Sequence, residues 1–216
     1  MNEPAKLTDG EKLSAAAQEI ADWKAPNADE IYAVQRMDAI GRAAMAVSDF
    51  RLAAKMFDEV TKLAPTRENY GSLGESYSRL GNLEKGKLAF DSALRIDPNW
   101  MEGWFNMGVM YDIAFKHDEA ERAYARSCDI QETAAARNPL ANQQRALLKL
   151  EEAEANYRRA VELGYPGAQM NLSLLLMMKG DYVAGLPLFE KREEFGSDAA
   201  YGPAREMLRI LRNTQA

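Results

Sequence analysis

Few residues in this 216-residue chain could perform nucleophilic chemistry. Cys128 is the only cysteine and His117 is the only histidine. A nucleophilic thiol needs an activating base within hydrogen-bonding distance, whereas eleven residues along one helix separate two positions by about 16 Å. We therefore expect Cys128 to pack within a helix and His117 to lie at a turn between helices, without forming a catalytic pair.

No other motif in the sequence points to catalysis or to a cofactor. Phosphate-binding glycine patterns and the metal-binding spacings H-E-x-x-H and C-x-x-C are all missing. His117 with Asp118 and Glu119 would offer too few ligands for a specific metal site. Carboxylate pairs such as Glu151-Glu152 fit exposed helix positions. The sequence predicts no enzyme activity, no cofactor and no metal site.

A repeated spacing of large and small residues carries more information. It reads Tyr70-x2-Leu73-Gly74-x2-Tyr77, then Gly86-x3-Phe90 and Pro98, and it returns as Trp104-x2-Met107-Gly108-x2-Tyr111 with Ala120-x3-Tyr124. A small residue followed four places later by an aromatic recurs five times: Ala53/Phe57, Gly86/Phe90, Ala120/Tyr124, Ala153/Tyr157 and Gly185/Phe189. The small residue lets a second helix approach, and the aromatic fills the space beside it.

This spacing resembles that of the tetratricopeptide repeat (TPR) family over about residues 34–195. The resemblance implies an all-α, right-handed α-solenoid of about five TPR-like helix pairs with capping helices at both ends. Residues 1–33 would hold the N-terminal capping helix and the start of the first repeat helix, and residues 196–216 would form the C-terminal capping helix. The implied function is that of a non-enzymatic adaptor or assembly scaffold, which binds a peptide segment in a concave groove.

The fourth repeat, near residues 131–150, departs from the pattern because it contains Pro139. A proline suits the first turn of a helix and breaks its interior. We therefore predict that Asn138 is an N-cap, that a short helix covers about 139–148, and that the preceding helix runs from about 117 through the alanines at 134–136. One continuous helix over 139–163 is an alternative, because turn residues are missing between Leu147 and Leu150.

The resemblance also implies which residues face a bound peptide, since first-helix positions line the groove in this family. The N-terminal half of the groove would be polar and rich in acids: Asp38, Arg42, Glu68, Glu75, Arg79 and Glu102. Its C-terminal half would be apolar: Phe105, Val109, Ile113, Met170, Leu174, Met177 and Met178. The expected partner is a protein or peptide with basic and apolar portions. The irregular fourth repeat would add Asn138, Asn142 and Arg145.

Three alternatives stay open. The methionine stripe, formed by Met170, Leu174, Met177 and Met178, could be part of the core. It would then be buried by a C-terminal helix that begins at Gly202-Pro203 and carries Met207, Ile210 and Leu211. The chain could instead be a self-associating scaffold that uses its apolar C-terminal half as a homo-oligomer interface. It could also be an accessory subunit of a multi-enzyme or secretion assembly.

One recognition mode known in the family is not expected. Some TPR proteins clamp the C-terminal carboxylate of heat-shock chaperones with lysine, asparagine and arginine side chains. Only Asn106 matches that set, and Glu75 would repel a carboxylate.

Composition excludes further classes of function. With 27 basic and 33 acidic residues the formal net charge is −6, which argues against nucleic-acid binding. No apolar run reaches the roughly 18 residues of a membrane span. The first residues, Met1 to Pro4, do not resemble a signal peptide. The single cysteine excludes an internal disulfide, and the expected location is the cytoplasm.

Overall fold

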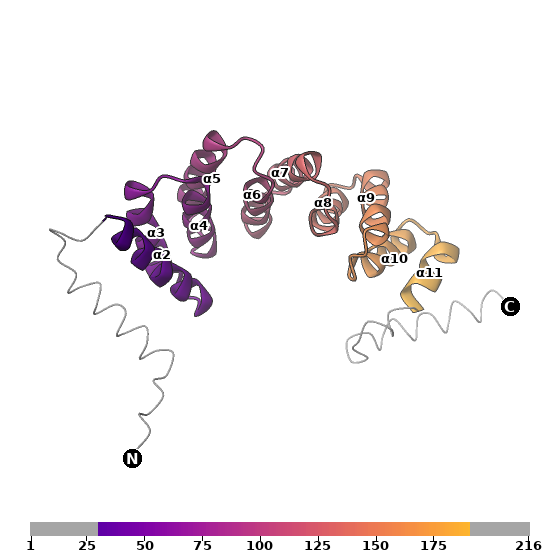
Figure 1. The fold of residues 1–216 in the computed structure, drawn as a ribbon. Coiled ribbons are helices and arrows are strands. Elements are labelled where there is room, and N and C mark those ends of the chain that lie inside the picture. The colour runs from indigo at the N-terminus through magenta and orange to yellow at the C-terminus, as the bar shows by residue number, and fades with distance from the viewer. Residues whose placement is uncertain (1–29, 191–216) are drawn as a thin grey trace, which may run out of the picture. The chain divides into compact units, whose positions relative to one another are not determined.

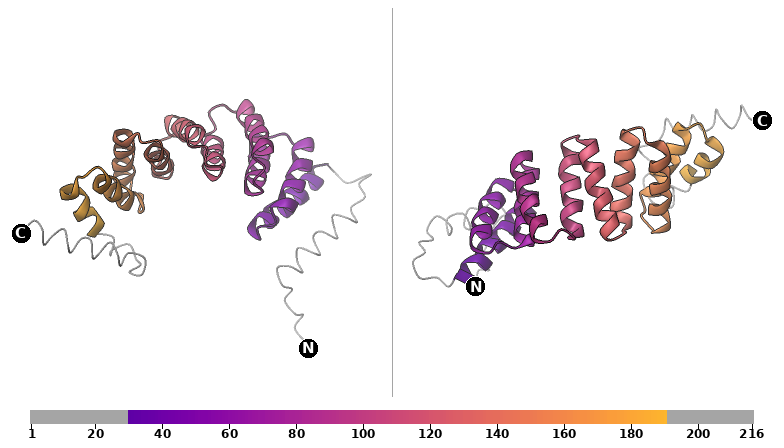
Figure 2. Two further views of the ribbon diagram at one scale, coloured as in Figure 1. Left: turned by 180° about the vertical axis from the view of Figure 1, so that it is seen from behind. Right: turned by 90° about the horizontal axis from the view of Figure 1, so that it is seen from above.

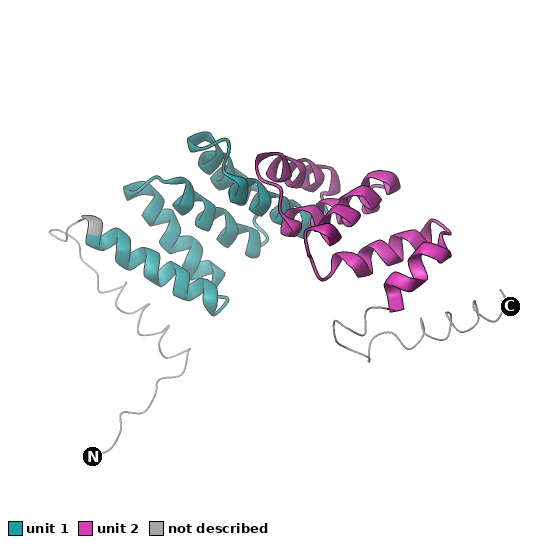
Figure 3. Cartoon of the chain, turned by 45° about the vertical axis from the view of Figure 1, so that its right-hand side comes forward, with its two compact units in different colours: residues 1–115 teal, residues 116–216 magenta. Residues whose placement is uncertain are grey.

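The computed structural model describes residues 30–190, which form helices joined by short turns (Figures 1 and 2). The chain divides into two compact units, residues 1–115 and 116–216 (Figure 3). The division falls between the two helices of the predicted third repeat. Both predicted capping helices lie outside the described residues. The first helix of the first repeat is described from Glu30 onward.

Each unit is a succession of packed helices. The first contains α2 (Glu30–Ala46), α3 (Phe50–Leu63), α4 (Arg67–Arg79), α5 (Leu83–Ile96) and α6 (Met101–Ile113). The second contains α7 (His117–Ile130), α8 (Ala134–Ala146), α9 (Leu150–Glu162), α10 (Ala168–Met178) and α11 (Tyr182–Glu190). Within each unit, every helix packs against the next one along the chain, and α4 also packs against α6.

The small and aromatic residues of the repeat form the core of both units. All ten residues of the five small–aromatic pairs are buried, as predicted. A Cβ atom placed on Gly74 would lie 2.9 Å from the ring of Phe90, and one on Gly41 would lie 2.9 Å from the ring of Phe57. Only glycine therefore allows these helices their observed approach. The prediction of paired helices is confirmed.

A residue with left-handed backbone conformation ends the first helix of each pair. In unit 1 these residues are Ser48, Gly81 and Phe115, with φ of 63°, 72° and 55°. In unit 2 they are Leu148 and Gly180, with φ of 60° and 87°. Glycine adopts this conformation freely, whereas a residue with a Cβ pays about 1–2 kcal/mol. Phe115 and Leu148 are therefore strained, and their side chains are 81% and 77% exposed.

The predicted boundaries of the fourth repeat were wrong. The preceding helix α7 ends at Ile130, and α8 begins at Ala134 after Thr133, whose Oγ1 accepts a hydrogen bond from the Ala136 amide at 3.2 Å. Pro139 lies inside α8, and Asn138 is a buried residue of the same helix rather than its N-cap. The threonine cap, which satisfies a free amide of the first turn, determines where the helix begins.

The alternative of one continuous helix over 139–163 was also wrong. The helix α8 ends at Ala146 and α9 begins at Leu150. Between them the amide of Lys149 donates to the carbonyl of Gln144 at 2.8 Å, and Leu148 takes up the left-handed conformation. The chain thus turns here without a glycine, so no residue type in this segment marks the break.

Candidate functional site

The polar first-helix positions of unit 1 carry paired charges. On α2, Arg42 Nε donates to Asp38 Oδ2 at 2.8 Å, and on α4, Arg79 lies 3.7 Å from Glu75. Glu68 accepts from Arg67 at 2.7 Å, and this hydrogen bond is the main cause that lowers the pKa of the Glu68 carboxyl. Because each of these three carboxylates lies beside an arginine, the surface is less acidic than the acids alone suggest.

The apolar positions of unit 1 lie along one helix, α6. Phe105 and Val109 are half-buried, whereas Ile113, at the end of the helix, is 49% exposed. Glu102 is exposed in the first turn of the same helix. Of the three apolar residues predicted here, Ile113 thus offers the most surface to a partner.

In unit 2 the predicted methionine stripe divides into two parts. Leu174 and Met178 are 44% and 54% exposed, and they lie one turn apart on α10. Met170 and Met177 are half-buried. Met177 packs against α11, since its Cγ lies 2.8 Å from the position that a Cβ on Gly185 would occupy. Only half of the stripe therefore presents substantial surface, and the other half contributes to packing.

Asparagine side chains link the first helices of unit 2. The Nδ2 group of Asn171 on α10 donates to Asn138 Oδ1 on α8 at 2.9 Å. Asn142 Oδ1 accepts from the Tyr157 hydroxyl at 2.6 Å, which joins α8 to α9. Two asparagines predicted to face a peptide are therefore engaged within the protein. Arg145, the third predicted residue of this repeat, is exposed.

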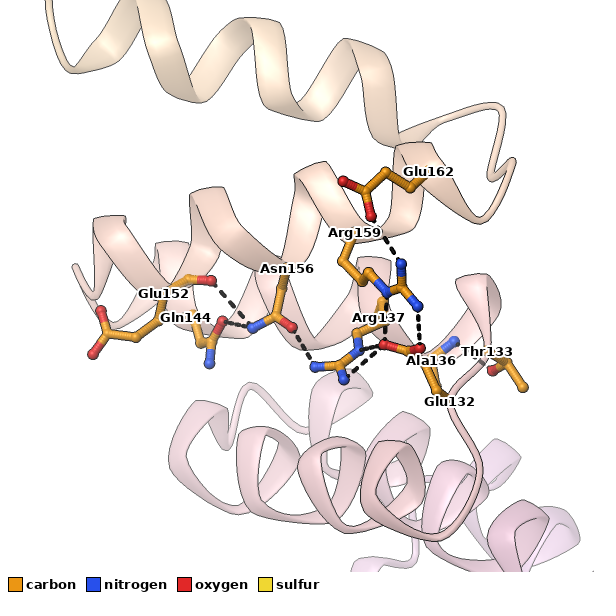
Figure 4. A network of polar contacts seen from close by, with 9 residues as sticks. All are labelled: Glu132, Thr133, Ala136, Arg137, Gln144, Glu152, Asn156, Arg159 and Glu162. Atoms are coloured by element: carbon orange, nitrogen blue, oxygen red, sulfur yellow. Dashed lines mark hydrogen bonds and ion pairs between the residues drawn. The ribbon is translucent and has the colours of Figure 1, made fainter.

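A second polar network holds α9 against the turn that precedes α8 (Figure 4). Glu132 accepts from Arg159 at 2.6 Å and lies 2.9 Å from Arg137, and together these contacts lower the pKa of Glu132 to about 2, with Arg159 the larger cause. Arg137 also donates to Asn156, whose Nδ2 group donates to Gln144 at 2.8 Å. The sequence gave no indication of this network, because its members lie up to 27 residues apart.

Trp100 is a packing residue of unit 1 that sequence reasoning missed. Its ring lies against Gly71 of α4 and Gly103 of α6, where a Cβ on either glycine would collide with the indole. The Arg67 guanidinium stands 5.8 Å from the ring centroid and also contacts Asp97. The available signal for this packing in the sequence was the presence of Gly71 and Gly103, two glycines whose spacing from Trp100 does not follow the small–aromatic repeat pattern.

Cys128 and His117, the two residues first considered for chemistry, both lie in surroundings that fit a structural role. Cys128 is 5% exposed, and burial raises the pKa of its thiol to about 11, which suppresses the reactive thiolate. His117 begins α7, and its Nδ1 lies 2.8 Å from Gln143 Oε1. Among residues 30–190, no three histidine, cysteine or acidic side chains gather as a metal site would require. None of the helices in that range is long and apolar enough to cross a membrane.

Comparison with known proteins identifies the repeat. The family model described as tetratricopeptide repeat matches residues 39–100 and 138–200, together more than half of the chain. The chain belongs to the tetratricopeptide repeat family. TPR proteins are interaction scaffolds that bind protein partners, and in this general sense the predicted role as adaptor or scaffold is confirmed.

Individual relatives extend the comparison. Small glutamine-rich tetratricopeptide repeat-containing protein 2 of Saccharomyces cerevisiae is 30% identical over 92 residues, which span 42% of this chain and 27% of the yeast protein. Crystal structures of MamA include one with a TM-score of 0.65 at 19% identity, covering 72% of this chain and 93% of MamA. Pseudomonas aeruginosa PilF has a TM-score of 0.68 at 14% identity, covering 79% and 80% of the two chains. At these identities, the structural matches establish the TPR fold alone.

Proposed function

We propose that this TPR chain binds a protein segment with apolar and basic portions on the first-helix surfaces of its repeats. One observation carries the proposal: the outward positions of the first helices change from charged on α4 to apolar on α10, although the buried positions keep the repeat pattern. Glu75 and Arg79 on α4 correspond in the repeat to Leu174 and Met178 on α10. Packing does not require this change, so recognition is its best explanation.

The two surfaces would make different contributions to binding. Ile113, Leu174 and Met178 would supply apolar contact area, for which flexible methionine is suited. The acids Glu68 and Glu75 would orient a basic portion of the ligand and raise its association rate. Each acid would exchange its contact with an arginine for a contact with a cation of the ligand. Such exposed ion pairs are worth only about 0.2–1 kcal/mol, so the exchange costs little.

Selection of peptides displayed on phage would test the proposal directly. The full chain, immobilised, should enrich peptides that combine large apolar residues with lysine or arginine. Ile113→Asp and the double variant Leu174→Asp/Met178→Asp should each weaken binding of the selected peptides about tenfold, because a charge replaces apolar contact area. Leu88→Asp is the matched control, since Leu88 is an exposed leucine on the second helix α5, at 66% exposure.

Two results would overturn this assignment of the surface. One is retention of full affinity by both first-helix variants while circular dichroism shows an intact fold. The other is equal loss of affinity in Leu88→Asp, which would place the binding surface on the second helices or reveal a general effect of charge.

Self-association is a second candidate, favoured by the exposure of Val183 on α11, which reaches 82%. An apolar side chain so exposed suits an interface between copies. Light scattering across a hundredfold dilution would detect a change in mass for the wild-type chain. Val183→Asp should then yield a constant monomer mass, and an unchanged profile in that variant would reject Val183 as part of the interface.

A further inference from the structure

The last described helix pair leaves an apolar surface uncovered. Leu174 and Met178 lie one turn apart on α10, and Tyr182 and Val183 open α11 directly after the turn. These side chains are 44%, 54%, 40% and 82% exposed, in that order. We call these four residues the α10–α11 strip. Exposed apolar residues grouped within ten positions of the chain indicate an interaction surface.

Carboxylates outnumber cations beside this strip. Lys179, in the turn between α10 and α11, reaches Glu154 at 2.7 Å and Glu151 at 3.5 Å. Glu154 also pairs with Arg158, and the Glu151 side chain is 80% exposed. Asp181 lies in the same turn, where its Oδ1 accepts from the Ala184 amide. A ligand for the strip should therefore combine apolar residues with positive charge.

The chain itself contains a segment of this chemistry beyond the described residues. Residues 203–213 carry the apolar residues Met207, Leu208, Ile210 and Leu211, and three arginines against one glutamate. Met207 and Leu211 have the same four-residue spacing as Leu174 and Met178. Apolar residues at 207, 210 and 211 would share one side of a helix. The segment thus matches the strip in both spacing and charge.

The length of the connection allows contact within one chain. Residues 191–202 follow α11 and would span up to about 40 Å if extended, at 3.3–3.6 Å per residue. The eleven residues of α10 measure only about 16 Å. A tethered segment also reaches a high effective concentration at its own surface, so even weak contacts suffice.

We propose that residues 203–213 dock on the α10–α11 strip of the same chain, with Met207, Ile210 and Leu211 against the strip and the arginines toward Glu151 and Asp181. Self-association through this strip, the second candidate above, would bring like-charged carboxylates together, which favours the segment over a second copy as the occupant. The docked segment has the chemistry of the ligand proposed above. A partner would therefore have to displace it, and the segment would act as an internal competitor.

Hydrogen–deuterium exchange of the full chain tests this docking without any partner. In the wild type, peptides covering 203–213 and 170–184 should both exchange more slowly than in variants that remove the contact. Leu174→Glu/Met178→Glu should speed exchange of 203–213 about tenfold, because the segment loses its surface. Leu88→Glu on α5 is the control and should leave both peptides unchanged.

A reciprocal variant keeps the test valid if the α10 substitutions disturb folding. Arg209→Glu/Arg212→Glu alters only the segment, yet it should speed exchange of 170–184 by uncovering the strip. Exchange of 203–213 at the rate of a free peptide in the wild type would overturn the proposal. Protection that disappears on dilution would also overturn it, in favour of contact between copies. Because no partner is present, these results are independent of the phage selection.

Discussion

The helices α4 and α10 occupy the same place in their repeats, but they present different residues at their outward positions. Both bury a small residue against the second helix, Gly74 in α4 and Ser173 in α10. Their outward positions differ, with the pair Glu75 and Arg79 on α4 and the pair Leu174 and Met178 on α10. The comparison teaches that the repeat fixes the buried positions and leaves the outward positions free to vary.

The largest expected effects come from the buried positions, which should respond alike in both units. Phe90→Ala in unit 1 and Tyr157→Ala in unit 2 each empty a fully buried site. Each should lower the free energy of unfolding by about 3–5 kcal/mol, since the surrounding helices cannot close the cavity. Urea denaturation followed by circular dichroism measures the loss. With Leu88→Ala as the exposed control, a cost below 1 kcal/mol at either site would break the equivalence of the two units.

The turns should respond in opposite directions. Gly81→Leu in unit 1 should destabilise by about 1–2 kcal/mol, because leucine is strained at φ 72° although nothing lies within 4 Å of its Cβ. Leu148→Gly in unit 2 should stabilise by about 0.5–1 kcal/mol, because relief of strain exceeds the entropy lost by glycine. Thermal unfolding compares both variants with the wild type. A lower melting temperature for Leu148→Gly would show that its exposed side chain makes contacts that stabilise the fold.

Replacing the outward residues of α4 with those of α10 should change peptide binding more than it changes the free energy of unfolding. Glu75→Leu/Arg79→Met gives α4 the character of α10 and should shift the free energy of unfolding by no more than about 0.5 kcal/mol, as is usual for exposed residues. The same variant should select more apolar and less basic peptides from the phage library. Unchanged peptide preference in this variant would mean that α4 takes no part in recognition.

The smallest effect concerns the acid titration of the network in unit 2. Arg159 and Arg137 lower the pKa of Glu132 to about 2, so its ion pairs stabilise the fold above the ordinary pKa of 4.5 and are lost as the pH falls from 4.5 toward 2. Carboxyl NMR signals of Glu132 should titrate in that window. In Arg159→Gln the pKa should rise toward 4.5, and a pKa already near 4.5 in the wild type would contradict the described contacts.

Much of the fold could be predicted because it depends on residue type at fixed spacing. The five small–aromatic pairs located the second helix of every repeat, since close packing accepts few other residues. The predicted boundary between α7 and α8 was wrong because Pro139 disfavours a helix interior, whereas the cap at Thr133 begins the helix before it. The left-handed turn at Leu148 carried no glycine. The spacing from Ser48 and Gly81 to the equivalent turn position was the overlooked guide.

The candidate site was less accessible to sequence reasoning. The helix α10 is apolar on nearly all sides, so its sequence could not show that Met177 packs on Gly185 while Met178 is exposed. Ion pairs within α2 and α4 were implied by the four-residue spacing of Asp38 with Arg42 and of Glu75 with Arg79. The links of Asn171 with Asn138 and of Tyr157 with Asn142 depend on the packing of separate helices, which the repeat pattern does not specify.

The placement of Trp100 between Gly71 and Gly103 has a consequence for how this chain can evolve. A larger residue at either glycine would collide with the indole, and at Gly103 it would also crowd Leu94 Cδ2, which lies 3.0 Å from the position of a Cβ. A smaller residue at position 100 would leave a void beside both glycines. The three positions should therefore be coupled: each substitution alone should destabilise the fold more than the same substitution combined with compensating changes at the other positions. Related chains should keep all three residues or replace them together.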